Sequence, residues 1–264
     1  MTLADLDWRV LGEETDDGPM TMAVEEIAAE TAADGGPATV RVYTWPDTLS
    51  LGYNQDPDSV DWDYCEREGI GVTRRPTGGG AIYHDHRADL SYSIVAPADA
   101  VPGDLMDCYD LFCAPIFDAF EGVGVDAGFV DAHRDAIHQP ACYLRALHPA
   151  HDIVGPDGRK IGGNAQYRRK DAVVQHGSLS VSLRAERHCG CFTGKPDPAA
   201  FRERVGAIDE YVDVDRADVV ATLRATLKQW VDADEGTWTD EERARASERA
   251  GETYATDEWV RRSP

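Results

Sequence analysis

The sequence has very little lysine and no long apolar run. Only four of its 264 residues are lysines, and no stretch approaches the ~18 apolar residues that a membrane-spanning helix needs. The N-terminus also lacks the basic stretch followed by an apolar one that marks a secretory signal. We therefore expect a cytoplasmic protein that does not enter a membrane.

Positive charge is scarce along the whole chain. Lys and Arg number 26 against 49 Asp and Glu, which gives a formal net charge of −23. A dispersed acidic surface resembles that of proteins working in concentrated salt, where a Debye length of ~3 Å at 1 M screens self-repulsion. This charge disfavours nucleic-acid binding through a general basic face. We expect a halophilic protein; an acidic protein made for a basic partner is the alternative.

The six cysteines include no CxxC pair and no spacing typical of a secreted disulfide framework. We expect reduced thiols, one or two of them reactive. His188, Cys189 and Cys191 form a cluster that could bind a metal. Its spacing is tight and no second ligand cluster accompanies it, so we predict no metal site.

Hydrophobic periodicity predicts strands and helices up to residue 182 and a mostly helical remainder. The expected helices span residues 20–33, 60–68, 105–120, 198–205, 217–231 and 240–254. The expected strands span 39–45, 48–53, 71–75, 89–95, 151–154, 172–176 and 178–181. We expect one α/β domain over residues 1–232, followed by a helical C-terminal tail over 233–264.

The run RRPTGGGAIYHD at residues 74–85 is the first candidate for chemistry. Its glycines permit positive φ and let a ligand lie against bare backbone, whose N–H groups can cradle an anion. Its two arginines supply planar forks suited to phosphate or carboxylate. A glycine-rich turn with two surface arginines is an equal alternative. The spacing fits neither a Walker loop nor the dinucleotide-binding fingerprint.

Two further runs follow downstream. RKIGGNAQ at residues 159–166 sets Lys160, one of the four lysines, beside two glycines. An ammonium there could hold an acyl carbonyl oxygen and stabilise the charge that develops on it during attack. A hairpin with a solvent-facing lysine is the alternative. QHGS at residues 175–178 could contact a ligand at a strand end, or could be a structural turn.

Together, and in this order, the three runs resemble the biotin/lipoate protein ligase and acyltransferase superfamily, most closely its lipoate–protein ligase branch. RRPTGGGAIYHD looks like the signature loop of that branch, KIGGNAQ like its lysine motif, and QHGSL like the strand that follows. LSLGYNQ at 49–55 and DLSYS at 89–93 also match. The resemblance covers roughly residues 18–230. It implies a mixed, largely antiparallel sheet flanked by helices.

Ligases of this branch use ATP to turn lipoate into lipoyl-adenylate and pass the acyl group to a lysine of a lipoyl domain. The resemblance therefore implies ATP with Mg²⁺, lipoate as acyl donor, and lipoyl domains of 2-oxoacid dehydrogenase complexes or glycine cleavage H protein as acceptors. Lys160 would contact the acyl carbonyl and the adenylate phosphate. The residues implied to border the acyl chain and phosphate are Arg74, Arg75, Thr77, Gly78, Gly79, Gly80, Ala81, Tyr83, His84, Gly162, Asn164, Ala165, His176 and Gly177. A separate accessory subunit is also expected, because the chain lacks the full accessory domain of many lipoate ligases.

An octanoyltransferase is the alternative within the superfamily. It needs no ATP, and a cysteine takes octanoate from acyl carrier protein as a thioester. Cys142 resembles the acylated cysteine of one transferase branch, although the stretch from Cys142 to Lys160 is a few residues longer here. Gly80 favours the ligase, because that transferase branch typically has arginine at this position. A non-catalytic lipoate-binding or scaffold protein is a further alternative, and we predict the ligase.

Overall fold

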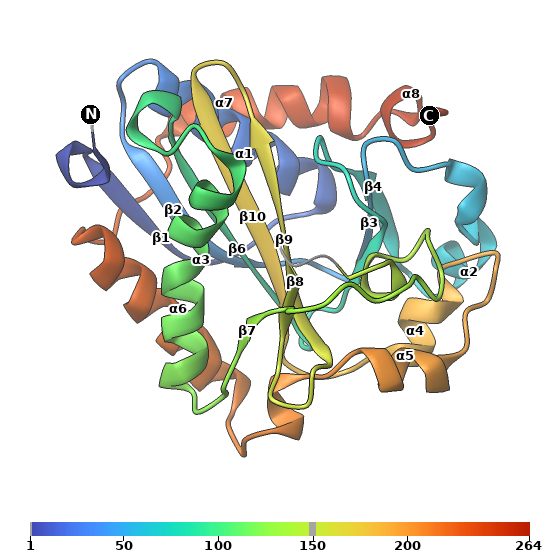
Figure 1. Ribbon diagram of the computed structural model, residues 1–264. Helices are drawn as coiled ribbons and strands as arrows, with labels where there is room; N and C mark the ends of the chain where they lie inside the picture. Colours follow the sequence, from blue (N-terminus) through green and yellow to red (C-terminus); the bar gives the residue numbers. More distant parts are fainter. Residues whose placement is uncertain (1, 148–151) are drawn as a thin grey trace.

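A seven-stranded sheet and a three-stranded sheet form the frame of the molecule (Figure 1). The computed structural model describes residues 2–147 and 152–264. The large sheet has the order β1-β2-β6-β10-β9-β8-β7, and the small sheet has the order β4-β3-β5. Pairing is parallel between β1 and β2 and between β3 and β4, and antiparallel elsewhere. The predicted mixed, largely antiparallel sheet is confirmed.

The bounds of the elements are as follows. The strands are β1 (Trp8–Thr15), β2 (Ala38–Thr44), β3 (Thr48–Leu51), β4 (Gly71–Arg74), β5 (Ile82–His84), β6 (Asp89–Pro97), β7 (Gly128–Phe129), β8 (Asp152–Val154), β9 (Lys160–Arg168) and β10 (Ala172–Ser180). The helices are α1 (Gly18–Ala33), α2 (Trp62–Arg67), α3 (Leu105–Gly122), α4 (Ala185–Gly190), α5 (Pro198–Arg204), α6 (Arg216–Val231), α7 (Asp240–Arg249) and α8 (Asp257–Val260). None of these described helices has the length and apolar character that crossing a membrane requires.

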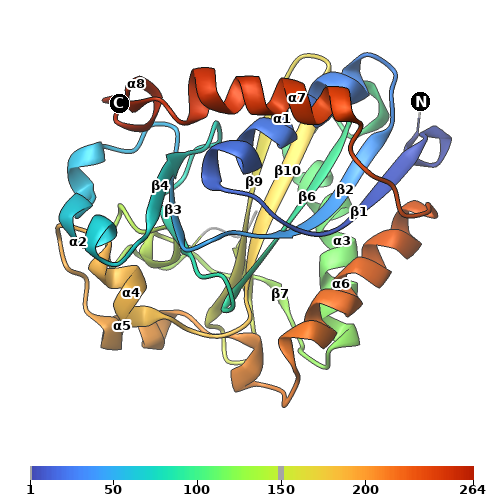
Figure 2. The ribbon, with the colours of Figure 1, turned by 180° about the vertical axis from the view of Figure 1, so that it is seen from behind.

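Helices cover both faces of the large sheet, so its central strands are buried on both sides. On β10, Val173 and Leu179 pack into the core cluster that includes α3 and α6. Val174, on the opposite face of the strand, packs against alanines of α1. Strands buried on both faces read as near-continuous apolar runs, and this is why β6 and β10 were recognisable in the sequence. Figure 2 shows α7 running beside α1 across the outer side.

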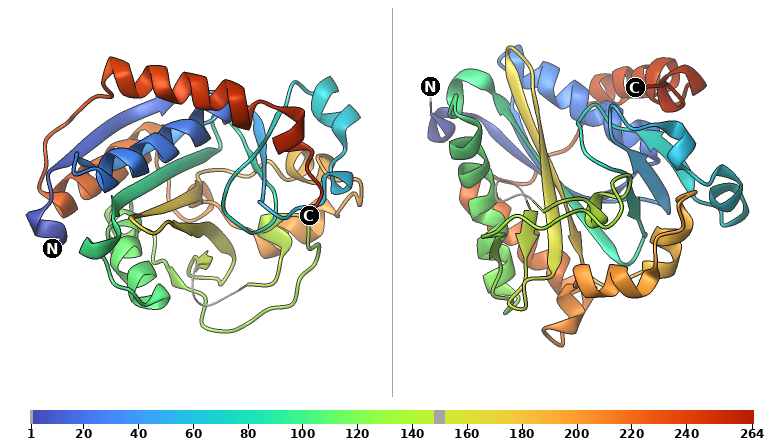
Figure 3. Two further views of the ribbon diagram at one scale, coloured as in Figure 1. Left: turned by 90° about the horizontal axis from the view of Figure 1, so that it is seen from above. Right: turned by 45° about the vertical axis from the view of Figure 1, so that its right-hand side comes forward.

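The small sheet carries its own core on the far side of the molecule from α3 and α6 (Figure 3). Leu49 and Leu51 of β3 pack there with Cys65 of α2 and Phe201 of α5. The same cluster includes Tyr143, from the segment that follows residue 140. The segment that carries Tyr143 is therefore held against the small sheet, beside the cavity described below.

Residues 233–264 close back on the beginning of the chain. Glu242 of α7 accepts two hydrogen bonds from Arg9 of β1, at 2.6 and 2.7 Å. Near the C-terminus, the guanidinium of Arg74 donates to the backbone carbonyl of Val260 at 3.0 Å. The tail is mostly helical, as predicted, and it is packed on α1.

Five strands differ from the sequence prediction, and the short strands β5 and β7 are two that were not predicted. Strand β1 was missed, because its segment does not alternate and is held by parallel pairing with β2, a tertiary contact. Strand β9 was not among the predicted strands, because glycines 162 and 163 have low strand propensity. Strand β10 is continuous where two strands were predicted, because β6 and β9 pair with it on both sides of Gly177. Of the strand predicted over 151–154, residue 151 lies outside the described residues and the rest is β8.

Candidate active site

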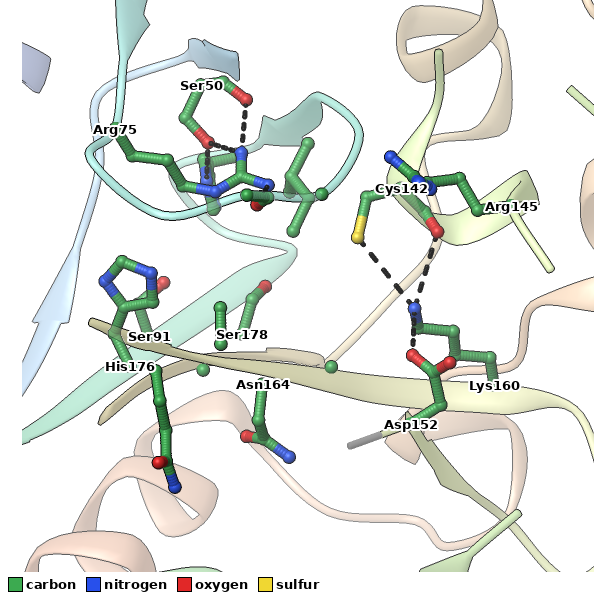
Figure 4. Close-up of a pocket in the computed structure, with 18 of the residues that line it drawn as sticks. Ser50, Arg75, Ser91, Cys142, Arg145, Asp152, Lys160, Asn164, His176 and Ser178 are labelled. Atoms are coloured by element: carbon green, nitrogen blue, oxygen red, sulfur yellow. Dashed lines mark hydrogen bonds and ion pairs between the residues drawn. The ribbon is translucent and has the colours of Figure 1, made fainter. Parts of the chain in front are cut away.

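A cavity of about 450 Å³ opens between the two sheets. Its lining comes from β3 and β5 of the small sheet, β9 and β10 of the large one, and the segment after residue 140 (Figure 4). The residues predicted from the sequence that line it are Arg75, Gly78, Gly79, His84, Cys142, Lys160, Asn164, Ala165, His176 and Gly177. Residues from all three runs are therefore brought together.

The other predicted residues do not line this cavity. They are Arg74, Thr77, Gly80, Ala81, Tyr83 and Gly162. The guanidinium of Arg74 donates to the carbonyls of Gly52, Gln55 and Val260, so its role is to hold backbone segments together. Tyr83 points to the opposite face of β5 from His84, as neighbours on a strand must. Its hydroxyl accepts from Arg187 at 2.7 Å, beside a smaller cavity.

Arg75 holds the glycine loop, which we define as residues 76–80. Its Nη2 donates to the carbonyls of Gly78 at 2.9 Å and Gly80 at 2.7 Å. Its Nη1 donates to the carbonyl of Ser50 at 2.8 Å, and its Nε donates to Thr77 Oγ1 at 3.1 Å. Burial lowers the pKa of this guanidinium, and its strong basicity still leaves it charged. Arg75 thus gives the loop its shape and the cavity a positive charge.

The glycine loop packs closely against the segment that carries Cys142. Gly79 takes a left-handed φ of 99°. A Cβ on Gly80 would lie 2.7 Å from the carbonyl oxygen of Pro140, 2.8 Å from the amide nitrogen of Cys142 and 2.9 Å from Cδ of Arg145. Position 80 therefore has no room for a side chain as long as the backbone of Pro140 and Cys142 keeps its place.

Two backbone hydrogen bonds join the end of this loop to the cysteine segment. Ala81 N–H donates to the carbonyl of Pro140 at 2.7 Å, and Cys142 N–H donates to the carbonyl of Ala81 at 2.8 Å. They form a parallel bridge between Ala81 and Ala141. Ala81 therefore acts through its backbone, by fixing the position of Cys142.

Lys160 lies at the start of β9, in a buried ion pair. Its Nζ is 2.6 Å from Oδ1 of Asp152 on the neighbouring β8. It also donates to the carbonyl oxygen of Cys142 at 3.4 Å and lies 3.9 Å from Cys142 Sγ. Burial alone would lower the pKa of Lys160, but Asp152 and Cys142 outweigh it and raise this pKa above its usual value. The side chain is a fixed ammonium beside a thiol.

His176 connects the cavity to α1. Its Nδ1 is 2.9 Å from Oε2 of Glu25, and its Nε2 is 2.9 Å from Oγ1 of Thr77. Burial would raise the pKa of Glu25, but His176 and Arg41 lower it. The histidine therefore joins a buried carboxylate of α1 to the base of the glycine loop.

His84 stands in a similar chain on the opposite wall. Its Nδ1 is 2.5 Å from Oδ2 of Asp89, and its Nε2 is 2.9 Å from Oγ of Ser50. The ring stacks on Trp45 with centroids 4.4 Å apart. Asp89 also accepts from Ser178 of β10. This arrangement fixes the ring of His84 and closes one side of the cavity.

Several side chains of this site were not predicted from the sequence. Asp152, Asp89 and Glu25 are partners of predicted residues, and Arg145 is a cation of the lining. Strand alternation could have placed Asp89, which begins a predicted strand. Arg145, three residues after Cys142, gave no signal in the sequence because its position depends on how its segment folds back.

Comparison with known proteins identifies the family of the chain. Residues 17–228 match the family described as the lipoyl protein ligase A/B catalytic domain. The octanoyltransferase LipM of Brevibacillus brevis is 29% identical over 96% of this chain and 98% of its own. A solved lipoate-protein ligase A bound with ATP superposes with a TM-score of 0.81 at 26% identity, covering 97% of this chain and 99% of that one.

A second solved relative comes from an archaeal lipoylation system. The bi-partite lipoate protein ligase of Thermoplasma acidophilum, described with its E2 lipoyl domain, superposes with a TM-score of 0.79 at 25% identity. The match covers 97% of this chain and 96% of that chain. The family match spans most of the sequence and includes all three runs. The chain belongs to the lipoyl protein ligase A/B catalytic-domain family, and it is an enzyme of the lipoate-protein ligase and octanoyltransferase group.

Proposed function

We propose that this enzyme is an octanoyltransferase that carries the acyl group on Cys142 and gives it to a lysine of a lipoyl domain. The observation that carries the proposal is the thiol of Cys142 in the cavity, 3.9 Å from the ammonium of Lys160. A relative that matches nearly end to end is named for octanoyl transfer. The sequence alone favoured the ligase, and the surroundings of Cys142 reverse that preference.

The proposed reaction has two balanced steps. In the first, the sulfur of Cys142 attacks the thioester carbonyl of octanoyl-acyl carrier protein, and the carrier leaves as a thiol with the proton that Cys142 gave up. In the second, the amine of the acceptor lysine attacks the acyl-Cys142 carbonyl. An amide forms, and Cys142 regains its proton.

Lys160 suits this chemistry as a cation. Thiolate is the nucleophilic form of cysteine, and a positive charge 3.9 Å away stabilises negative charge on sulfur. Because Asp152 keeps Lys160 protonated, the ammonium holds its positive charge beside the sulfur throughout the reaction. Asp152 acts through Lys160 as a positioning residue.

Gly80 is weaker support for a ligase than the sequence suggested. Position 80 lacks the arginine that the resemblance implies for a transferase. In the structure, the side chain of Arg145 lies against Gly80, so a cation from another segment occupies this side of the cavity.

An ATP-dependent lipoate ligase is the second candidate, because a solved relative of nearly equal extent is bound with ATP. That route would use lipoate, ATP and Mg²⁺, with the accessory subunit as a further expectation. In the described part of the lining, Asp152 is the one carboxylate, and it is paired with Lys160. Mg²⁺ takes oxygen ligands such as free carboxylates, so these residues do not fit a magnesium site and we derive no step through the ion.

One assay separates the two candidates. Purified protein in concentrated salt is given an apo lipoyl domain and either octanoyl-acyl carrier protein or lipoate with ATP and Mg²⁺, and the acceptor mass is measured. We expect octanoylation that Cys142→Ala abolishes, together with a mass increase on Cys142 when the acceptor is omitted. Cys189→Ala, a change at a buried thiol outside the cavity, is the matched control and is expected to keep activity.

The contrary outcomes are distinct. Modification from lipoate and ATP that survives Cys142→Ala establishes the ligase and overturns the transferase. Tight lipoate binding with no modification under either condition favours the non-catalytic alternative.

A further inference from the structure

Three cations contribute to the described lining of the cavity, namely Arg75, Arg145 and Lys160 (Figure 4). One carboxylate, Asp152, faces them from the same lining. This local surplus of positive charge is found in a chain whose net charge is −23. Such a concentration of cations suits a ligand with a negatively charged oxygen.

Two of the three cations have no hydrogen-bond donor left for a ligand. Every nitrogen of the Arg75 guanidinium donates to groups of β3 or the glycine loop. An ammonium has three N–H donors, and Lys160 directs its own toward Asp152 and toward the carbonyl and sulfur of Cys142. Both residues add charge to the cavity, but neither offers a free N–H.

Arg145 differs from them. Its side chain makes no hydrogen bond or ion pair with any residue that the structure describes, and it is only half-buried. Burial and the neighbouring charge of Arg145 both lower the pKa of Arg75, whereas Cys142 raises it. A guanidinium whose donors are not used by any described residue therefore stands near a second guanidinium.

Arg145 lies near Cys142 both in the chain and in the lining of the cavity. It follows Cys142 by three residues, at the end of the short 3-10 turn Cys142–Leu144. Its stem passes Gly80 at the point where Gly80 also faces the amide of Cys142. Figure 4 shows the Arg145 side chain beside Cys142, on the same wall.

We propose that Arg145 binds the oxygen on C1 of the acyl group and stabilises the oxyanion that forms when Cys142 attacks. This inference rests on the proposed function. As the sulfur–carbon bond forms, the carbonyl π electrons move to oxygen, where Arg145 donates N–H bonds to the negative charge. When the oxyanion collapses, the carbonyl re-forms and the carrier thiol leaves. Arg145 thus takes the carbonyl contact that the family resemblance implied for Lys160, and the ammonium of Lys160 faces the sulfur of Cys142.

Binding of two acyl probes tests the contact without chemistry. In a Cys142→Ala background, octanoate carries a charged oxygen at C1, and octanamide is its neutral counterpart of equal length. Calorimetry in concentrated salt is expected to show that Arg145→Gln lowers the affinity for octanoate ~10–100-fold, which is the range for losing a hydrogen bond to a charged group. The affinity for octanamide is expected to fall less than ~3-fold. Arg145→Lys, which keeps the charge but loses the fork, is expected to fall between the two.

Arg67→Gln, at an exposed arginine of α2, is the control and should change neither affinity. Thermal melts check that each variant folds, and Arg145→Lys provides the comparison if Arg145→Gln does not. Equal loss of octanoate and octanamide, or no loss of octanoate, overturns the proposal.

A kinetic arm uses the active enzyme. Acylation of Cys142 by octanoyl-acyl carrier protein, followed by intact mass, is expected to slow ~100–1,000-fold in Arg145→Gln with little change in KM, as for other oxyanion donors. If the wild type forms no acyl-cysteine, the proposed function fails while octanoate binding still decides the role of Arg145. If Arg145→Gln acylates normally and binds octanoate normally, Arg145 has no such role and the proposed function stands.

Discussion

The buried ion pair between the first strand and the tail makes a quantitative prediction. We expect Glu242→Gln to lower the free energy of unfolding by about 2–3 kcal/mol near pH 7. Burial alone would raise the pKa of Glu242, but the hydrogen bonds from Arg9, Thr239 and Thr31 and the charge of Arg9 outweigh it and lower this pKa from 4.5 to about 2. The difference of ~2.5 units corresponds to ~3.4 kcal/mol at 1.36 kcal/mol per unit, and the glutamine amide retains part of the bonding.

The same pKa fixes the pH dependence. The unfolded chain takes up a proton at Glu242 as pH falls through 4.5, whereas the folded chain resists protonation until about pH 2. The stabilisation is therefore complete above the unfolded pKa and is lost as pH falls toward about 2. The difference in free energy of unfolding between wild type and Glu242→Gln should therefore become smaller as pH falls from 4.5 toward 2.

Urea unfolding in concentrated salt, followed by circular dichroism near pH 7 and near pH 3, measures both effects. Glu241→Gln is the matched control, because Glu241 is the exposed neighbour of Glu242 in the first turn of α7. A Glu242→Gln variant no less stable than Glu241→Gln would refute the reasoning. A loss of stability in Glu242→Gln that is larger near pH 3 than near pH 7 would also refute it.

Three further predictions concern the site and the surface. Lys160→Met is expected to abolish acyl transfer while leaving the far-ultraviolet dichroism unchanged, with a lower melting temperature because buried Asp152 loses its ammonium; an active variant contradicts the role of Lys160. Cys142 is the one cysteine of the six that is not buried, so alkylation of the native protein should label it first. Peptide mass mapping that finds Cys65 or Cys189 labelled equally fast argues against this site. Dilution into low salt should unfold the chain through self-repulsion at a net charge of −23, and a constant dichroism signal counts against halophilic character.

The order of motifs in the sequence predicted which segments meet at the cavity. Lys160 and His176 lie on β9 and β10, which pair directly in the sheet. The sequence pattern alone did not distinguish which of two adjacent motif residues faces the cavity, although the alternation of side chains along a strand allows this. Arg74 and Arg75 are adjacent at the end of β4 and point to different surroundings, one to the C-terminal backbone and one to the cavity.

The residues that sequence reasoning missed depend on contacts between distant segments. Asp152 meets Lys160 because β8 and β9 pair across a hairpin with an irregular register. Arg145 lies in the cavity because its segment returns to the end of the glycine loop. Neither position follows from periodicity or propensity, which describe only local structure. The helices and two-sided strands were predictable because burial itself sets their apolar pattern.

The bridge between Ala81 and Ala141 has a consequence for how the two segments open. Ala81 and Cys142 share a backbone hydrogen bond although they are 61 positions apart in the chain. The end of the glycine loop and the nucleophile are therefore held together. A local opening of one segment is therefore expected to release the other, and the amide protons of Ala81 and Cys142 should exchange with solvent at a common rate.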